Sequence, residues 1–255
     1  SPHLFSINER FAINNEYISD RELCEMYEHL KKQVEIQLTF FEWCTLIAFT
    51  YFKEQGIKWA IVETGLGGRL DATNSVKPDL SVITSISLDH QNILGSTLKE
   101  IAKEKGGIIK HNSTLFSPTS NRNLGLEEIA RNKKADIHWV GVADELKMTN
   151  KQLAASVAHH LYYGSPDDVD LREPSCGLVS YLIPNCKKVL LDVGHNCAAM
   201  QRSWQLIKHK NTVPVLIVKS EKMTPEWMSW IDQTFVHIYV IACDGFVEPD
   251  ELKKC

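Results

Sequence analysis

The sequence predicts an α/β protein with a mainly parallel sheet flanked by helices, followed by a second, smaller α/β domain. Apolar strand-like runs alternate with helical stretches through the first part of the chain, a pattern that favours a parallel sheet covered on both faces. A segment with two prolines and four acids over 164–174 interrupts this alternation, which then resumes. We therefore expect one domain over 1–163, a linker over 164–174 and a second domain over 175–255.

The individual elements follow from periodicity and from start signals. Thr39 and Glu42 have the spacing of a capping box, which predicts the start of a helix over 40–55. Elements expected in the first domain are helices 20–34, 40–55, 96–105, 126–133 and 152–163, with strands 58–63, 80–86, 115–116 and 136–140. Elements expected in the second are strands 188–192, 213–218 and 236–243, with helices 198–208 and 225–234.

Composition excludes several classes of function. The 255 residues are 44% apolar, which is enough to form a hydrophobic core. The formal charge is −4 and the sequence has no dense basic block, which argues against a nucleic acid or an anionic membrane as the main partner. The longest apolar stretch, 38–52, is too short to span a bilayer. Seven cysteines without C-x-x-C spacing indicate a reducing compartment. No secretory signal begins the sequence, so we expect a cytoplasmic protein, with a mitochondrial location left open. We also expect a monomer.

Polar residues follow two strands predicted to be neighbours. The run 58–63 ends on Glu63 and breaks into a glycine-rich stretch, and the run 80–86 leads to Asp89 and His90. A predicted helix then delivers Lys105. Because ligands bind at the carboxyl ends of strands in parallel α/β sheets, these side chains predict a single site.

Each of these residues also has a plainer interpretation. Glu63 could be a solvated carboxylate, His90 a hydrogen-bonded rim histidine, and Lys105 a solvated cation near a helix end. The glycines at 65, 67 and 68 could simply permit a turn, and their spacing is not the G-x-G-x-x-G fingerprint of a dinucleotide site.

Longer strings of sequence carry a resemblance. The chain closely resembles the folylpolyglutamate synthase/dihydrofolate synthase family of Mur-type amide ligases, most clearly over residues 1–140. The strings that carry it, in order, are SPHL from Ser1, NER from Asn8, TFFE from Thr39, ETGLGGRLDATN from Glu63, LDH from Leu88, IAKEKGGIIK from Ile101 and LDVGHN from Leu191.

The resemblance implies a Mur-ligase-type central domain and an ATP-dependent amide ligase. Such enzymes phosphorylate a substrate carboxylate, and the amino group of glutamate then attacks the acyl phosphate. Magnesium would align the phosphoryl groups, with Ser1, Glu63 and His90 as ligands by correspondence. Lys105 corresponds to a lysine that the family carbamoylates, although it could remain a plain lysine.

The resemblance also assigns the small-molecule contacts, with dihydropteroate or folate, ATP and glutamate as partners. Phe41, Asp71, Ala72 and Arg69 would bind the substrate, although Phe41 could be a core residue and Asp71 a turn cap. Arg10 and Arg69 could contact phosphate, the glutamate tail or surface acids. The residues expected to bind ATP are Asn74, Asp192 and Asn196, and those expected to act with Lys105 in catalysis are Asp192 and His195.

Two departures from the family pattern indicate an alternative to an active ligase. The phosphate-binding P-loop expected shortly before Ser1 is not in these residues, so we expect at best very weak ATP binding and little or no turnover. Leu178 stands where the family has an arginine. The alternative is therefore a catalytically inactive fragment or degenerate paralogue that folds without turnover. A Mur-type ligase acting on a cell-wall precursor is less favoured, because of the string Leu70 to Asn74.

Overall fold

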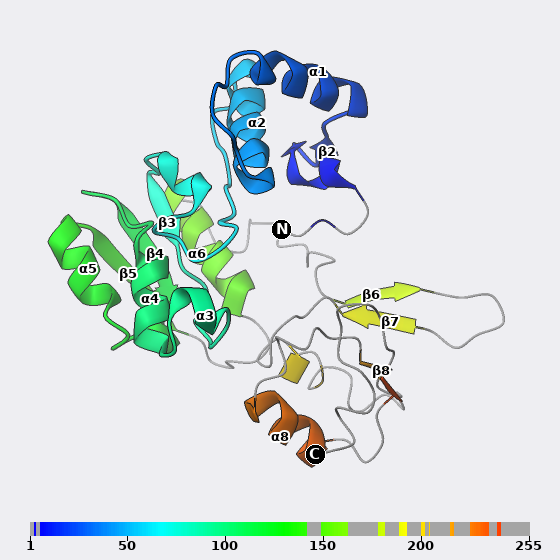
Figure 1. The fold of residues 1–255 in the computed structure, drawn as a ribbon. Helices are drawn as coiled ribbons and strands as arrows, with labels where there is room; N and C mark the ends of the chain where they lie inside the picture. The colour runs from blue at the N-terminus through cyan, green and yellow to red at the C-terminus, as the bar shows by residue number, and fades with distance from the viewer. Residues whose placement is uncertain are drawn as a thin grey trace. The chain divides into compact units, whose positions relative to one another are not determined.

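The computed structural model describes most of the first 162 residues and short segments beyond them (Figure 1). The described residues are 3, 6–141, 149–162, 178–181, 189–192, 200–201, 204, 215–216, 225–234 and 239–240. The chain divides into two compact units, Ser1–Ala143 and Asp144–Cys255. This division groups residues 149–162 with the second unit, whereas the sequence analysis places them in the first domain, so the predicted domain bounds remain a prediction.

The first unit begins with a small helical layer around its own core. Its elements are η1 (Ile7–Arg10), β1 (Ala12–Ile13), β2 (Glu16–Tyr17), α1 (Asp20–Lys31) and α2 (Phe40–Glu54). The core joins Phe11 and Ile18, from the ends of the β1–β2 hairpin, to Met26 of α1 and Ile47 of α2. Burial of these apolar side chains fixes α2 against α1.

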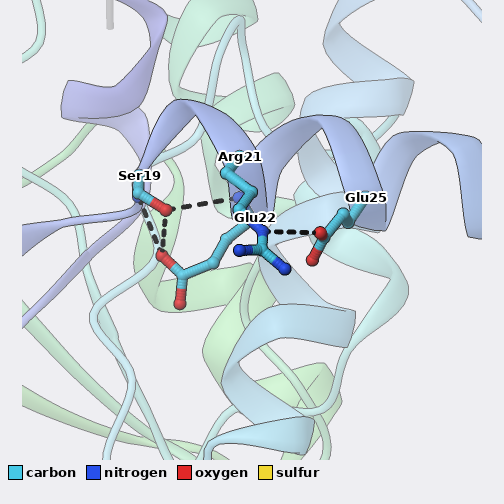
Figure 2. Close-up of polar contacts among 4 residues, drawn as sticks. All are labelled: Ser19, Arg21, Glu22 and Glu25. Carbon is cyan, nitrogen blue, oxygen red and sulfur yellow. Dashed lines mark hydrogen bonds and ion pairs between the residues drawn. The ribbon is translucent and has the colours of Figure 1, made fainter.

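Both long helices of this layer begin with a capping box. In α1 the backbone N–H of Glu22 donates to Ser19 Oγ (3.2 Å), and Ser19 N–H donates back to Glu22 Oε2 (3.0 Å), as Figure 2 shows. One turn on, Arg21 pairs with Glu25 at 2.8 Å. Thr39 and Glu42 repeat the arrangement at the start of α2, which confirms the predicted cap.

A parallel sheet forms the rest of the first unit and confirms the α/β class. Strands β3 (Leu80–Val82), β4 (Thr114–Pro118) and β5 (Asp136–Val140) pair in that order, both pairs parallel. Ala102 of α4 and Leu126 of α5 pack with Leu115 in one core, so both helices cover the same face. The remaining elements are η2 (Ala72–Ser75), α3 (Gln91–Leu94), α4 (Leu98–Gly106), η3 (Thr119–Asn121) and α5 (Leu126–Lys133).

The second unit is described only in part. It contains α6 (Thr149–Tyr162), β6 (Leu178–Tyr181), β7 (Val189–Asp192), β8 (Val215–Leu216), α8 (Pro225–Thr234) and β9 (Tyr239–Val240). Strands β6 and β7 pair antiparallel, and β8 pairs parallel with β9. The predicted linker 164–174 and most of the predicted helix 198–208 lie outside the described residues. Within the described chain, no helix is both long and apolar enough to cross a bilayer.

The prediction of a strand over residues 58–63 is wrong. These residues form no strand in the structure, and Trp59 and Ile61 are 58% and 101% exposed. A strand requires a neighbour for its backbone N–H and C=O groups, and none of the described strands pairs with this segment. The predicted strand 80–86 is also shorter than expected, because pairing in β3 ends at Val82.

Candidate functional site

The glycine-rich loop that follows Glu63 packs against α2 and α3. A Cβ atom on Gly65 would lie 2.5 Å from Cζ of Phe41, so the ring of Phe41 covers the α-carbon of this glycine. A Cβ atom on Gly67 would lie 2.8 Å from Cδ2 of Leu94, and Gly67 also has a positive φ of +69°. Both glycines are therefore required by close contact, and the second by its backbone conformation as well.

The same loop packs against the carboxyl end of α4. A Cβ atom on Gly68 would lie 2.8 Å from the carbonyl oxygen of Lys105. The next residue, Arg69, donates its backbone N–H to the carbonyl of Glu104 (2.8 Å), and its Nε donates to both carboxylate oxygens of Glu104 at 3.1 Å. One short loop thus contacts three helices. They are α2, which carries Phe41, α3, which begins directly after His90, and α4, which carries Lys105.

Asn74 secures this loop rather than pointing away from it. Its Nδ2 donates to the carbonyl of Arg69 (3.0 Å) and to the carbonyl of Gly107 (3.2 Å), and its own carbonyl accepts from Nζ of Lys110 (2.9 Å). A Cβ atom on Gly107 would lie 2.5 Å from the α-carbon of Arg69. Arg69 and Asn74 therefore join the loop to the end of α4, and their predicted ligand contacts remain predictions.

Asp71 caps the short helix η2, as its plainer interpretation expects. Its Oδ2 accepts from the backbone N–H of Leu66 (2.9 Å), and its Oδ1 accepts from the N–H (2.9 Å) and hydroxyl (2.5 Å) of Thr73. A carboxylate has about four acceptor positions, so these contacts leave room for a further donor. A role of Asp71 in binding a pterin stays a prediction.

His90 and Lys105 share a neighbour, Asp89. His90 adopts a left-handed backbone conformation with φ 49°, uncommon outside glycine, and its N–H donates to Asp89 Oδ1 at 2.8 Å. Lys105 is half-buried. Burial lowers the pKa of Lys105 below its usual value, while the charge of Asp89 opposes that shift. The structure therefore places the Asp89–His90 turn within electrostatic range of Lys105.

A pocket of about 400 Å³ brings Phe41 and Glu63 together with Arg10. The guanidinium of Arg10 lies 5.6 Å from the ring centroid of Phe40, and its Nε donates to Nδ1 of His3 at 3.0 Å. An aromatic face, a carboxylate and a cation on the walls of a pocket of this size suit a flat polar ligand.

Ala72 lines a second pocket, of about 440 Å³, with Glu42, Phe49 and Ser75. Phe49 of α2 also lines the pocket that holds Glu63, so the helix forms part of both walls. The structure therefore places Ala72 beside α2 in a different pocket from Phe41 and Glu63.

The structure leaves the predicted magnesium site untested. Among the described residues, no group of three or more His, Cys, Asp or Glu side chains lies close enough to hold a metal ion. The predicted set includes only two such side chains, Glu63 and His90, and its third member, Ser1, lies outside the described residues. Glu63 is exposed and His90 half-exposed, so an ion could reach both donors.

The predicted residues of the second unit are described least. Asp192 is the last residue of β7, and its side chain is outside the description. His195 and Asn196 lie outside the described residues altogether. Their assignment to ATP binding and catalysis stays a prediction.

Two residues beside the site received no role from the sequence. The negative charge of Asp89 acts to raise the pKa of Lys105, and Glu104 forms an ion pair with Arg69 at 3.1 Å. The position of Asp89 directly before His90, at the end of a predicted strand, was a usable signal. The Arg69–Glu104 pair joins residues 35 apart in sequence, and no local pattern indicates such a pair.

Curated relatives match the chain by sequence. It is 49% identical over 118 residues to a dihydrofolate synthase/folylpolyglutamate synthase of Bacillus subtilis, which covers 43% of this chain and 27% of that protein. It is 30% identical over 230 residues to the protein of that name in Buchnera aphidicola from Schizaphis graminum, covering 78% and 54%. The chain thus spans about half or less of these relatives. No family model matches it.

Solved structures match the fold. A Mycobacterium tuberculosis folylpolyglutamate synthase complexed with ADP superposes with a TM-score of 0.84 at 23% identity, over 99% of this chain and 69% of that one. Escherichia coli FolC in complex with DHPP and ADP gives 0.80 at 22% identity, over 100% and 70%. A bifunctional folylpolyglutamate synthase/dihydrofolate synthase with Mn, AMPPNP and L-glutamate bound gives 0.81 at 23% identity, over 100% and 70%.

The parallel sheet, its covering helices and these superpositions define an α/β protein with the fold of Mur-type ligases. Together with the sequence matches, these superpositions identify the family of the chain. It belongs to the dihydrofolate synthase/folylpolyglutamate synthase family.

Proposed function

We propose that the chain is part of an ATP-dependent ligase that adds L-glutamate to dihydropteroate or to a folate. One observation carries the proposal. The loop that follows Glu63 contacts α2 through Gly65, α3 through Gly67 and α4 through Gly68. A loop fitted to three helices holds their candidate side chains in fixed relation, as a two-substrate reaction requires.

The pocket beside Glu63 is the proposed folate site. The ring of Phe41 offers a stacking face for a pterin, and Arg10 offers a cation for a carboxylate or phosphate. Asp71 would contribute from the cap of η2, whereas Ala72 lines the second pocket and would contact only a part of the substrate that reaches it. Gly65 keeps the ring of Phe41 in place, because any side chain there would collide with it.

The proposed chemistry proceeds in two displacements. A carboxylate oxygen of the folate precursor attacks the γ-phosphorus of ATP, the bond to the β-phosphate oxygen breaks, and ADP leaves. The amino nitrogen of glutamate, having lost a proton, then attacks the acyl carbon, and inorganic phosphate leaves as the amide forms. Both steps bring anions together, so the site must supply positive charge and exclude water.

Magnesium would supply that charge by neutralising and aligning the phosphoryl oxygens. Glu63 and His90, with Ser1, are the proposed ligands. The carboxylate of Glu63 is the hard oxygen donor that magnesium prefers, and the His90 imidazole is a softer donor. In its left-handed turn, the backbone N–H of His90 donates to the side-chain carboxylate of Asp89.

Lys105 is the proposed carbamate. Carbon dioxide adds only to a neutral amine, and burial favours the neutral form by lowering the pKa of Lys105. The product is an anion, which suits a site for cations better than an ammonium group does. From the second unit, Asp192, His195 and Asn196 would bind ATP, and Asn74 would contribute where its carboxamide oxygen faces the ligand.

The test is a pair of measurements on the full chain. Titration calorimetry measures binding of dihydropteroate and folate, and incorporation of labelled glutamate at high protein concentration measures ATP-dependent turnover. We expect binding of one of the two folates and ATP-dependent incorporation that Glu63→Ala abolishes. Incorporation by Glu63→Ala equal to the unmodified chain would remove Glu63 from the site.

Binding without incorporation would instead support the alternative, a folded relative that retains the folate site without catalysis. Absence of both binding and incorporation would remove the proposed function. Gly141→Ala is the matched control, because a Cβ atom at Gly141 meets nothing within 4 Å and φ there is not positive.

A further inference from the structure

A fully buried amide side chain binds the segment that leads to the turn with His90. Asn121, the last residue of η3, is only 1% exposed. Its Oδ1 accepts from the backbone N–H of Ile86 (3.1 Å), and its Nδ2 donates to the carbonyl of Thr84 (2.7 Å) and to Oγ of Ser117 (3.0 Å). Oδ1 and both Nδ2 hydrogens can therefore form hydrogen bonds with groups of the protein itself.

These contacts continue the sheet past the point where its strands separate. Pairing of β3 with β4 ends at Val82, apart from one further bond in which Ile83 N–H donates to the carbonyl of Phe116 (3.0 Å). Beyond Ile83 the carboxamide of Asn121 supplies one donor and one acceptor, as a neighbouring strand would. The hydroxyl of Ser117, itself buried, donates to the carbonyl of Ile83 (3.0 Å) and completes the arrangement.

The segment held in this way leads directly to the candidate site. Ile86 precedes Asp89 by three residues and His90 by four, and a residue of extended chain spans at most about 3.5 Å. Ile86 therefore lies no more than about 14 Å along the chain from His90. A displacement at Ile86 would change the start of this short connection to the left-handed turn at His90.

We infer that Asn121 is a positioning residue for Asp89 and His90, with Ser117 as its partner. The part of this inference that concerns metal binding rests on the proposed function, because His90 is a ligand only in that proposal. The competing explanation is that Asn121 serves stability alone. In that case its loss would weaken the fold without a selective effect on the His90 turn.

Three substitutions separate the two explanations. Asn121→Asp keeps the shape and the acceptor for Ile86 N–H but removes the donors to the carbonyl of Thr84 and to Oγ of Ser117. Ser117→Ala is milder and removes only the bridging hydroxyl. The matched control is Ser113→Ala at the opposite end of β4, where a buried hydroxyl donates to the carbonyl of Lys110 (2.8 Å) and accepts its N–H (3.2 Å).

The experiment measures two quantities on the full chain and on each variant. Hydrogen–deuterium exchange follows the backbone amides of residues 84–94, and Mn²⁺ titration followed by electron paramagnetic resonance gives the affinity for a divalent cation. We expect Asn121→Asp and Ser117→Ala to loosen the segment, to speed exchange of the amides between Ile86 and His90 about tenfold or more, and to weaken Mn²⁺ binding at least threefold. Ser113→Ala should lower the urea midpoint of unfolding by a similar amount but should change neither the exchange over 84–94 nor the Mn²⁺ affinity.

Two outcomes would overturn the inference. One is exchange over 84–94 that is unchanged in both variants or equally faster in Ser113→Ala. The other is faster exchange with Mn²⁺ affinity equal to that of the unmodified chain. If the unmodified chain binds no Mn²⁺, the proposed metal site fails, and exchange alone then decides whether Asn121 positions the turn.

Discussion

The ring of Phe41 lies directly over the α-carbon of Gly65, so close that a Cβ atom on Gly65 would come within 2.5 Å of the ring. Replacement by alanine must therefore move the ring. Because the far end of a side chain can shift more easily than backbone, we expect Gly65→Ala to fold and to lose the stacking face.

For Gly65→Ala we expect dihydropteroate or folate affinity to fall roughly three- to tenfold, the range expected when an aromatic contact is lost. Titration calorimetry gives the affinity, and Gly141→Ala is the control with open space around the new methyl group. Equal affinities for the unmodified chain and Gly65→Ala would remove Phe41 from the folate site.

The contact between the loop and α4 predicts an order of stabilities. The Arg69–Glu104 pair is partly solvent-exposed, with 52% of the Arg69 side chain accessible, so Glu104→Gln should cost only about 0.5 kcal/mol. Gly107→Ala forces a methyl group against the backbone of Arg69 and should cost about 1–3 kcal/mol. Urea unfolding measures both values, and the reverse order would contradict the packing described for this loop.

The cap of α2 should matter to ligand binding, and the cap of α1 should not. Thr39→Ala and Ser19→Ala each remove the side chain of a capping box, and each should cost about 1 kcal/mol of stability. Only Thr39 lies two residues before Phe41, so only Thr39→Ala should also weaken folate binding. An equal effect of both substitutions on affinity would show that the loss reflects stability alone.

Carbamate formation on Lys105 should depend on pH in a defined direction. Burial lowers the pKa of Lys105, so its neutral amine becomes populated at lower pH than that of an ordinary lysine, whose pKa is about 10.4. As the pH rises through this lowered pKa, the fraction able to react with carbon dioxide increases.

With ¹³C-labelled bicarbonate, we therefore expect a carbamate resonance that grows as the pH is raised from neutrality. Lys105→Arg should remove it, whereas Lys103→Arg, on the exposed side of the same helix, should leave it. A resonance that persists in Lys105→Arg would assign the carbamate to another amine.

Much of the fold was readable because local signals agree with tertiary packing. The Thr39–Glu42 box marks the start of α2, and the bounds of α5 and β5 match the predictions. A further turn was readable but missed. Asn14 and Asn15, between β1 and β2, both have positive φ, as in the two-residue hairpin turns that asparagine favours.

The errors concern features that depend on distant residues. The run Trp59–Val62 has the composition of a buried strand, but composition cannot reveal that no described strand pairs with it. Asn121 binds Ile86, beyond the end of β3, from 35 residues away, which no local pattern indicates. In the same way, the sequence identified the glycines of the loop but not the helix that each one contacts.

The most direct test of the central claim is titration of the full chain with dihydropteroate, folate and a UDP-sugar precursor, in parallel with Phe41→Ala. We predict that dihydropteroate or folate binds, that Phe41→Ala weakens this binding about tenfold or more, and that the UDP-sugar does not bind. Binding of the UDP-sugar in place of either folate, or folate binding that Phe41→Ala leaves unchanged, would contradict the assignment of this pocket.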